Sequence, residues 1–378
     1  MATDTKPKGG LEDVVATSSA ICYLDGERGV LAYCGYDIHD LAQSATFEEV
    51  CYLLWHRRLP TRAEVGDLQS QLAAARALPE PIIRLMRSLP PVDGMDALRT
   101  LTSALAHYDA EASDAAPQAQ YRKAVRLTAQ AGSIVATWGR LQKGGGPIAP
   151  DPALSHAANF LYMLTGERPN PTATRAFDIA LVLHADHELN ASTFVGRVAA
   201  ATLTDIYSAV VGAIGALKGP LHGGANAEVM RMLLELGETA SGDRVDEFVR
   251  GKFARKEKIP GFGHRVYKTE DPRATHLRQM SRELGKKAGT GWYDISQRIE
   301  ALVKSEKKLN ANVDFYSAST YYTAGIPIDL YTPIFAVSRM SGWTAHILEQ
   351  YANNRLIRPR ADYIGPEYPQ RFVPLDAR

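Results

Sequence analysis

Apolar residues along this 378-residue chain recur mainly at the three- and four-residue spacing of helices, and alternating stretches typical of strands are scarce. Two Thr-x-x-Glu sequences, beginning at Thr46 and Thr61, fit capping boxes at helix starts. A longer helix is predicted over residues 121–141, after a polar loop over residues 104–118. We therefore expect an all-α protein with at most a few short strands.

Helical periodicity continues through the middle of the chain. Between residues 172 and 189, one helical face is predicted to carry Phe177, Leu181, His184 and Glu188. The following stretch, residues 194–217, is rich in Ala, Gly, Val and Ile. Because small residues allow helix axes to approach closely, this stretch is typical of a buried helix or a subunit interface.

The chain changes character over residues 223–314, where charged helices flank a loop rich in Gly and Pro. Apolar helices resume over residues 317–326 and 332–351. This order predicts a large, discontinuous helical domain formed by residues 1–222 and 315–378. A smaller, mobile helical domain, residues 223–314, would be inserted in it.

Composition argues against several classes of function. Lys and Arg number 43 against 42 Asp and Glu, so no overall field favours nucleic acid or a membrane surface. The most apolar run, residues 209–217, is too short to cross a bilayer, and residues 1–10 do not resemble a signal peptide. Three widely spaced cysteines predict neither a disulfide framework nor a zinc knuckle. We expect a cytoplasmic protein.

The segment from His184 to Asn190 places His184 and His187 three residues apart, hence on one helix face. A metal pair is one interpretation, although the His-Glu-x-x-His pattern of zinc proteases is absent and no third ligand is obvious. Two structural histidines are a second interpretation. We favour a third, in which one histidine binds substrate and no metal is held.

His222 lies between Gly-Pro and Gly-Gly, which predicts a tight turn leading into a helix over residues 225–236. The positive potential at a helix N-terminus disfavours an imidazolium and leaves a neutral hydrogen-bond donor. Such a donor is suited to stabilising an enolate. The alternative is a histidine that only fills the turn.

The run from Lys258 to Lys268 places glycines on both sides of Phe262, so its backbone can lie close to a flat ring. Its basic side chains can meet phosphates, and Arg273 downstream can grip a carboxylate with both guanidinium nitrogens. A Rossmann nucleotide site is not favoured, because Val266 stands where the third glycine belongs.

Asp314 stands between apolar neighbours, so burial should raise its pKa and make it a better base. An aspartate that caps the next helix is the alternative. Arg339 and Arg358 are two more candidate carboxylate binders, although a lone helix Arg is usually a solvated charge.

These segments, in this order, resemble the citrate synthase family in its short, dimeric type. The similarity runs from Gly10-Leu11-Glu12-Asp13-Val14 to Leu356-Ile357-Arg358-Pro359. It is most specific in Leu221 to Asn226 and in Gly261 to Lys268, with Asp271-Pro272-Arg273 downstream. Cys34 and Arg57 depart from the family pattern, in which Arg and Gly are common at these positions. The resemblance implies an all-α fold in which a small domain closes over the substrates.

The resemblance implies an acyltransferase that condenses acetyl-CoA with oxaloacetate and water, giving citrate and CoA through an enol(ate) and citryl-CoA. His222, His264 and Asp314 are then the catalytic trio. Asp314 takes a proton from the acetyl methyl group, His222 hydrogen-bonds the enolate oxygen, and His264 polarises the oxaloacetate carbonyl. Acetyl-CoA is a co-substrate, and no cofactor is bound permanently.

The resemblance also assigns binding residues. His187, Arg273 and Arg339 would hold oxaloacetate, and Arg358 would reach in from the other subunit of a homodimer. The expected coenzyme A contacts are Lys258, Ile259, Pro260, Gly261, Phe262 and Lys268.

Three other functions stay open. A 2-methylcitrate synthase would use propionyl-CoA on the same scaffold, and one methylene is worth only about 1–3 kcal/mol of discrimination. A metal-dependent enzyme built on His184 and His187 is less favoured. A non-catalytic relative is disfavoured because all three catalytic residue types are present.

Overall fold

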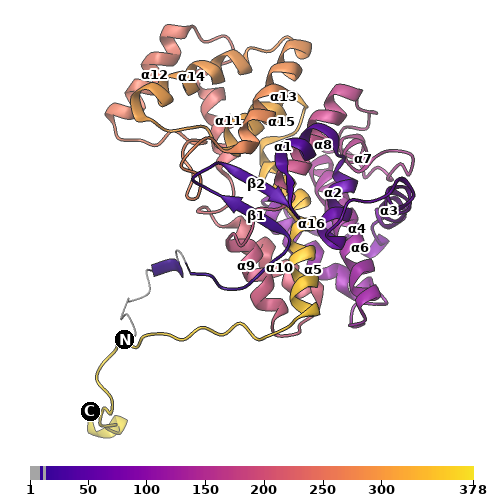
Figure 1. Ribbon diagram of the computed structural model, residues 1–378, viewed down its shortest axis with the longest axis vertical. Coiled ribbons are helices and arrows are strands. Elements are labelled where there is room, and N and C mark those ends of the chain that lie inside the picture. The colour runs from indigo at the N-terminus through magenta and orange to yellow at the C-terminus, as the bar shows by residue number, and fades with distance from the viewer. Residues whose placement is uncertain (1–8, 12–13) are drawn as a thin grey trace.

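The computed structural model describes residues 9–11 and 14–378. Glu12 and Asp13 of the family match, and most of the start considered as a signal peptide, lie outside the described residues. Within the described part of the chain, sixteen α-helices accompany one small three-stranded sheet (Figure 1). The prediction of an all-α fold with a few short strands is confirmed.

The helices before residue 223 are α1 (Ile38–Ser44), α2 (Phe47–His56), α3 (Arg62–Ala75), α4 (Glu80–Ser88), α5 (Gly94–Leu105), α6 (Pro117–Gln142), α7 (His156–Thr165), α8 (Pro171–His184), α9 (Ala191–Ala200) and α10 (Ile206–Lys218). Those after it are α11 (Ala225–Leu236), α12 (Gly242–Ala254), α13 (Pro272–Ala288), α14 (Trp292–Lys307), α15 (Val313–Thr323) and α16 (Tyr331–Ala352). Short 3₁₀ turns cover Gly9–Leu11, Ala106–Tyr108, Ile328–Leu330 and Leu375–Ala377.

Local sequence signals account for several helix ends. The Thr46 and Thr61 side chains each accept a hydrogen bond from the backbone N–H three residues later. The glutamate carboxylate at that position accepts the backbone N–H of the threonine, so both capping boxes are confirmed. The helix predicted over residues 121–141 lies within α6. The loop predicted over residues 104–118 is shorter than expected, because α5 and a 3₁₀ turn occupy its start.

The helix predicted to carry both His184 and Glu188 is wrong in its second half. Helix α8 ends at His184, and Glu188 has a left-handed φ of 54°. The Glu188 N–H donates to the Asp186 carboxylate (3.2 Å), and Asn190 caps α9. The chain therefore turns here instead of continuing as a helix. Residues 194–217 likewise divide into two helices, with Asp205 capping α10.

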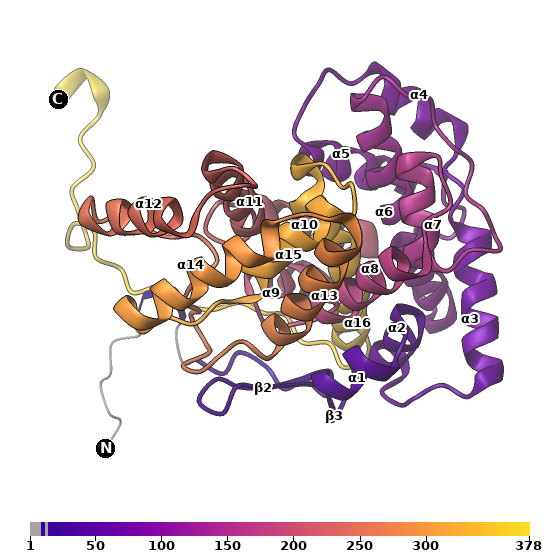
Figure 2. The ribbon, with the colours of Figure 1, turned by 90° about the horizontal axis from the view of Figure 1, so that it is seen from above.

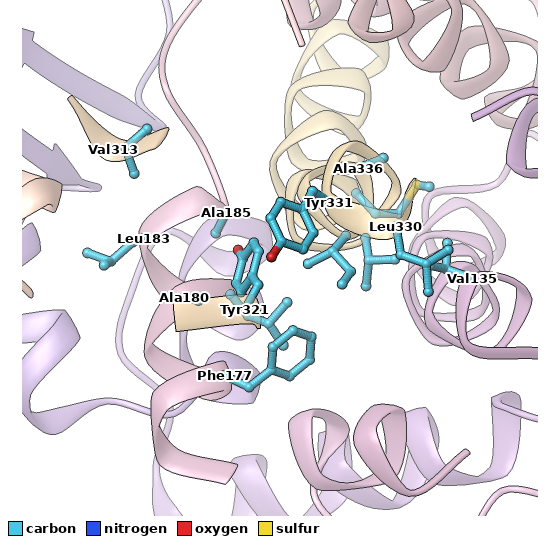
Figure 3. Close-up of a cluster of buried hydrophobic side chains, with 14 of the residues drawn as sticks. Val135, Phe177, Ala180, Leu183, Ala185, Val313, Tyr321, Leu330, Tyr331 and Ala336 are labelled. Carbon is cyan, nitrogen blue, oxygen red and sulfur yellow. The ribbon is translucent and has the colours of Figure 1, made fainter. Parts of the chain in front are cut away.

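Helix α16 lies at the centre of the main body. It packs against α6, α8, α9, α10 and α2, and its side chains are buried over most of its length. Figure 3 shows the apolar cluster where Tyr331, at its start, meets Tyr321 of α15 and Phe177 of α8. The Tyr331 hydroxyl donates to the Ala318 carbonyl oxygen (2.9 Å), so its one polar atom is satisfied in the core.

The sheet is a hairpin extended by one short strand. β1 (Cys22–Asp25) pairs antiparallel with β2 (Val30–Tyr33), which pairs with β3 (Tyr36–Asp37). Figure 2 shows the hairpin at the edge of the helical body, below α13. The segment after α16 runs away from that body as an extended arm in both views. None of the helices in the described residues is long and apolar enough to span a membrane.

Candidate active site

His222 lies in the turn before α11, and this helix covers residues 225–236 as predicted. Its Nε2 lies 2.8 Å from the Ser192 hydroxyl and accepts the Ser192 backbone N–H (3.3 Å). Because Nε2 accepts a hydrogen bond from this N–H, the proton of the neutral ring lies on Nδ1. Burial, reinforced by the charge of Arg339, lowers the pKa of His222 to about 4. The residue is therefore a neutral donor near pH 7.

His264 is held in the opposite tautomer. Its Nδ1 accepts the backbone N–H groups of Val266 (3.0 Å) and Tyr267 (3.2 Å). The proton of the neutral ring therefore lies on Nε2. Burial, with the positive charge of Arg273, lowers the pKa of His264 to about 4. His264 is thus a second neutral donor, suited to a carbonyl oxygen.

His187 follows α8 in the turn described above and is buried. Its Nε2 lies 3.1 Å from the Tyr267 hydroxyl, and its ring centroid lies 5.4 Å from that of His264. Burial and the charge of Arg273 hold its pKa well below the usual value. His187 and His264 therefore form one neutral pair.

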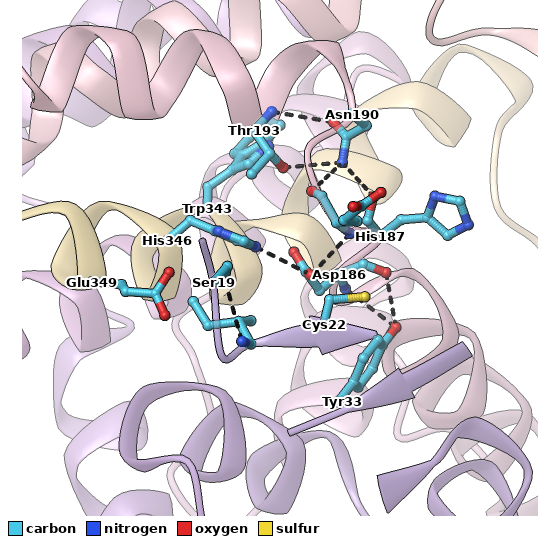
Figure 4. A network of polar contacts seen from close by, with 12 residues as sticks. Ser19, Cys22, Tyr33, Asp186, His187, Asn190, Thr193, Trp343, His346 and Glu349 are labelled. Atoms are coloured by element: carbon cyan, nitrogen blue, oxygen red, sulfur yellow. Dashed lines mark hydrogen bonds and ion pairs between the residues drawn. The ribbon is translucent and has the colours of Figure 1, made fainter. Parts of the chain in front are cut away.

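A polar network supports the turn that carries His187 (Figure 4). The Tyr33 hydroxyl bonds the backbone of Asp186, at 3.0 Å from its carbonyl oxygen and 3.2 Å from its nitrogen. The Asp186 carboxylate lies 3.3 Å from His346 Nε2, and His346 Nδ1 accepts a guanidinium N–H of Arg197 (3.0 Å). The turn is thus fixed from two sides.

Asp314 lies in the first turn of α15, but Asn312 caps that helix, so Asp314 is not the cap. The Asp314 carboxylate has no hydrogen bond or ion pair with any described residue. Burial raises its pKa from 3.8 to about 6, Arg273 opposes this rise, and Asp271 adds to it. An unpaired carboxylate with this pKa can act as a general base near neutral pH.

The two buried arginines, Arg273 and Arg339, differ in whether a carboxylate of the protein balances their charge. Arg273 forms a bidentate ion pair with Asp271, with its Nε 2.9 Å and one terminal nitrogen 2.8 Å from the two carboxylate oxygens. Arg339 donates its Nε–H to the His184 carbonyl oxygen (2.7 Å), and no carboxylate of a described residue lies within 4 Å of it. Burial lowers the pKa of Arg339. Arg339 is therefore a buried cation without a protein anion.

Hydrogen bonds join these groups into one site. Asn190 donates to the His187 carbonyl oxygen (3.3 Å), and its side-chain oxygen lies 2.7 Å from the Ser192 hydroxyl, which also contacts His222. On the other side, the Asn312 side chain donates to the Gly263 carbonyl oxygen (2.8 Å), which ties the start of α15 to the His264 loop. The structure thus brings together His187, His222, His264, Arg273, Asp314 and Arg339.

The predicted coenzyme A segment lies beside this site. Ile259 is buried, whereas Lys258 and Lys268 are exposed, and Pro260 joins the segment to its glycine turn. Gly261 has a φ of +83°, and a Cβ there would lie 2.9 Å from the Phe315 side chain. The Phe262 ring packs on the same Phe315 ring at a centroid distance of 4.5 Å.

Arg358 lies away from the other predicted site residues of its own chain. It is exposed on the extended arm and lines a groove of about 900 Å³. The other side chains that line this groove include Arg57, Arg197 and Glu349. Within one copy of the chain, Arg358 therefore does not complete the site.

The geometry of His184 differs from that of a metal pair with His187. Because α8 ends at His184, the prediction that both histidines lie on one helix face is wrong. His184 Nδ1 donates to the Ala180 carbonyl oxygen (2.7 Å), as a structural histidine does. Across the described residues, no group of three His, Cys, Asp or Glu side chains is placed to hold a metal ion.

Ser192, Tyr267 and Asp271 belong to the site but were missed by sequence reasoning. Tyr267 and Asp271 lie in the motifs described in the sequence analysis, so their position in these motifs could have identified them as site residues. Ser192 carries no such signal, because only the fold brings it to His222.

A family model described as "Citrate synthase, C-terminal domain" matches residues 10–360. The chain belongs to the citrate synthase family. It is 56% identical to citrate synthase 2 of Bacillus subtilis, with 98% of both chains covered. It is 52% identical to the citrate synthase of Haloferax volcanii, over 98% of this chain and 99% of that relative. A 2-methylcitrate synthase of Shewanella oneidensis is also similar, with 41% identity over 98% of this chain and 97% of that one.

Solved structures of the citrate synthase family share the fold. The enzyme from Pyrobaculum aerophilum matches with a TM-score of 0.89 and 42% identity, covering 98% of this chain and 95% of that one. The Thermoplasma acidophilum citrate synthase, solved as a ternary complex with carboxymethyl coenzyme A and oxaloacetate, matches with a TM-score of 0.89 and 32% identity. That match covers 98% of each chain.

Proposed function

We propose that this protein condenses acetyl-CoA with oxaloacetate and water to form citrate and CoA. The observation that carries the proposal is the pairing of two neutral histidine donors of opposite tautomer with one unpaired carboxylate whose pKa is about 6. Enolisation of a thioester needs a base and a donor on its carbonyl oxygen, and attack on a ketone needs a second donor. Citrate synthases among the relatives support the same reading.

The reaction follows from these positions. Asp314 removes a proton from the acetyl methyl group, while the Nδ1–H of His222 hydrogen-bonds the developing enolate oxygen. The Nε2–H of His264 polarises the ketone of oxaloacetate, and the enol carbon attacks the ketone carbon to form the new C–C bond. The C=O π bond opens to an alkoxide, which takes up one proton as the hydroxyl of citryl-CoA and so balances the proton held by Asp314. Water then cleaves the thioester of citryl-CoA, releasing citrate and CoA. Both histidines are neutral near pH 7, so neither protonates the enolate prematurely.

We assign oxaloacetate binding to Arg339, Arg273 and His187. Arg339 supports this assignment most directly, because it is buried without a carboxylate partner. A bound dicarboxylate would supply the missing anion through charge-assisted hydrogen bonds. Arg273 already shares its charge with Asp271 and retains one terminal nitrogen outside that ion pair. The loop that carries Lys258 and Lys268 is the proposed coenzyme A contact.

We further propose that the active unit is a homodimer in which each Arg358 serves the partner's site. The arm after α16 exposes Tyr363, Ile364, Tyr368 and Phe372 by 72–93%. Exposed apolar side chains gathered in this way mark an interaction surface, and a second copy would cover them. Residues 223–314 would form the domain that closes on the substrates. A cytoplasmic location stays a prediction.

The deciding experiment measures free thiol released from acetyl-CoA or propionyl-CoA in the presence of oxaloacetate. A higher kcat/KM with acetyl-CoA is expected. A preference for propionyl-CoA would make the protein a 2-methylcitrate synthase on the same site. Release with neither thioester would refute the proposal.

A further inference from the structure

The turn of the N-terminal hairpin, residues 26–29, lies against the loop that carries His264. The two segments run side by side in both overall views, where the turn meets the loop between α12 and α13 (Figures 1 and 2). The Lys268 backbone N–H donates a hydrogen bond to the Gly26 carbonyl oxygen (2.9 Å). This contact joins segments more than 200 residues apart in the chain.

The fit at this contact leaves no room for a side chain. A Cβ on Gly26 would overlap the Val266 carbonyl oxygen and lie 2.9 Å from its carbonyl carbon. A Cβ on Gly29 would lie 2.5 Å from Thr269 Oγ1. Since both distances are below ordinary van der Waals contact, the turn fixes where the backbone of residues 266–269 can lie.

The peptide unit between Val266 and Tyr267 transmits this contact to His264. Its carbonyl oxygen faces Gly26, and the N–H at its other edge donates to His264 Nδ1 (3.2 Å). A peptide unit is planar, so a push on the oxygen moves the N–H as well. The tautomer of His264 depends on that N–H and on the Val266 N–H (3.0 Å).

The same hairpin reaches the His187 turn at its other end. Tyr33 is the last residue of β2, and its hydroxyl holds the backbone of Asp186. One small sheet therefore contacts both segments that carry the paired histidines, whose ring centroids lie 5.4 Å apart.

We propose that the hairpin turn at Gly26 is a positioning element that keeps His264 in its Nε2–H form. In this proposal Gly26 acts on His264 through the Val266–Tyr267 peptide. The inference rests on the proposed role of His264 in polarising oxaloacetate. The proposed control of the His264 tautomer by a turn that is remote in sequence can be measured without an activity assay.

The test replaces Gly26 by alanine. Displacement of the peptide by about 1 Å should lower kcat by about 10²-fold. The matched control is Gly66→Ala in α3, where a Cβ meets nothing within 4 Å, and its kcat should be unchanged. Far-UV circular dichroism reports whether each variant is folded.

Nitrogen NMR of histidine-labelled protein gives the second readout, with the His264 signal assigned from a His264→Gln variant. In the wild type, Nδ1 of His264 should be the unprotonated nitrogen. In Gly26→Ala, the two nitrogens should show mixed protonation. A folded Gly26→Ala variant with unchanged kcat, or with lowered kcat and an unchanged His264 signal, would overturn the inference.

If Gly26→Ala does not fold, the NMR measurement on the wild type still tests the His264 tautomer that the inference requires. A proton on Nδ1 of His264 in the wild type would then refute the proposed control. Absence of thiol release by the wild type would refute the proposed function, whereas the tautomer measurement would still stand on its own.

Discussion

Replacing Asp314 by asparagine should remove catalysis and at the same time stabilise the fold. Burial raises the pKa of this carboxyl from 3.8 to about 6. Each pKa unit corresponds to about 1.4 kcal/mol, so keeping Asp314 ionised in the native protein costs about 3 kcal/mol well above pH 6. Asparagine has nearly the same shape and carries no charge, so it escapes this cost.

The raised pKa of Asp314 makes the stability of the fold depend on pH. A group whose pKa is raised in the folded state binds its proton more tightly there, so it reduces stability as pH rises from about 4 through about 6. Relative to the wild type, Asp314→Asn should gain about 3 kcal/mol in free energy of unfolding at pH 8 and about half of that at pH 5. Its turnover should fall by about 10²–10⁴-fold through loss of the base.

Urea unfolding, followed by circular dichroism at pH 8 and pH 5, measures the stability difference. Thiol release measures turnover, and isothermal titration checks that oxaloacetate still binds. Asp67→Asn, at an exposed position of α3, is the matched control and should change neither quantity. Lost turnover without any gain in stability at pH 8 would refute the argument from burial. Near-normal turnover would show that another group is the base.

Further predictions concern binding, assembly, pH and folding. Arg339→Gln should raise the KM for oxaloacetate by roughly 10–100-fold in steady-state assays, because a charge-assisted hydrogen-bonded pair is worth about 1.5–3 kcal/mol; an unchanged KM would exclude Arg339 as a ligand. Mixing Arg358→Ala and Asp314→Asn subunits, each inactive alone, should restore about a quarter of wild-type activity through heterodimers with one complete site, and no recovery would contradict a shared site. In the wild type, kcat/KM should rise with pH through about 6 as Asp314 ionises, and a flat profile from pH 5 to 7 would contradict this. Thr46→Ala should lower the free energy of unfolding by about 1 kcal/mol in urea titrations, because it removes the cap of α2; an unchanged midpoint would show that the cap is not needed.

Helix starts and the glycine-flanked turn at His222 could be predicted from the sequence because their causes are local. A capping threonine and its glutamate lie three residues apart, and the helix over residues 225–236 is flanked by Gly224 and Gly237 as its capping residues. Local chemistry therefore determines these boundaries with little help from the rest of the fold.

The end of α8 could not be predicted, because its causes are distant in sequence. The helical spacing of residues through His184 predicts that the helix continues to Glu188. In the structure, the Tyr33 hydroxyl and His346 hold Asp186 in a turn instead. The tautomers of His222 and His264 could not be predicted either. Each depends on backbone N–H groups whose positions follow from tertiary packing. Sequence motifs identified the chemical groups, whereas the fold determines which ring nitrogen of each histidine carries the proton.

The central place of α16 has a consequence for synthesis of the protein. Residues 331–352 fill the middle of the main body and supply Arg339, yet they follow α6, α9 and α10 in the chain and so leave the ribosome after these helices. Until they emerge, the faces of α6, α9 and α10 that cover this helix have no partner, and long-range contacts of this kind form slowly. The body therefore cannot complete its core before α16 has emerged, and until then the nascent chain should depend on chaperones that shield apolar surface.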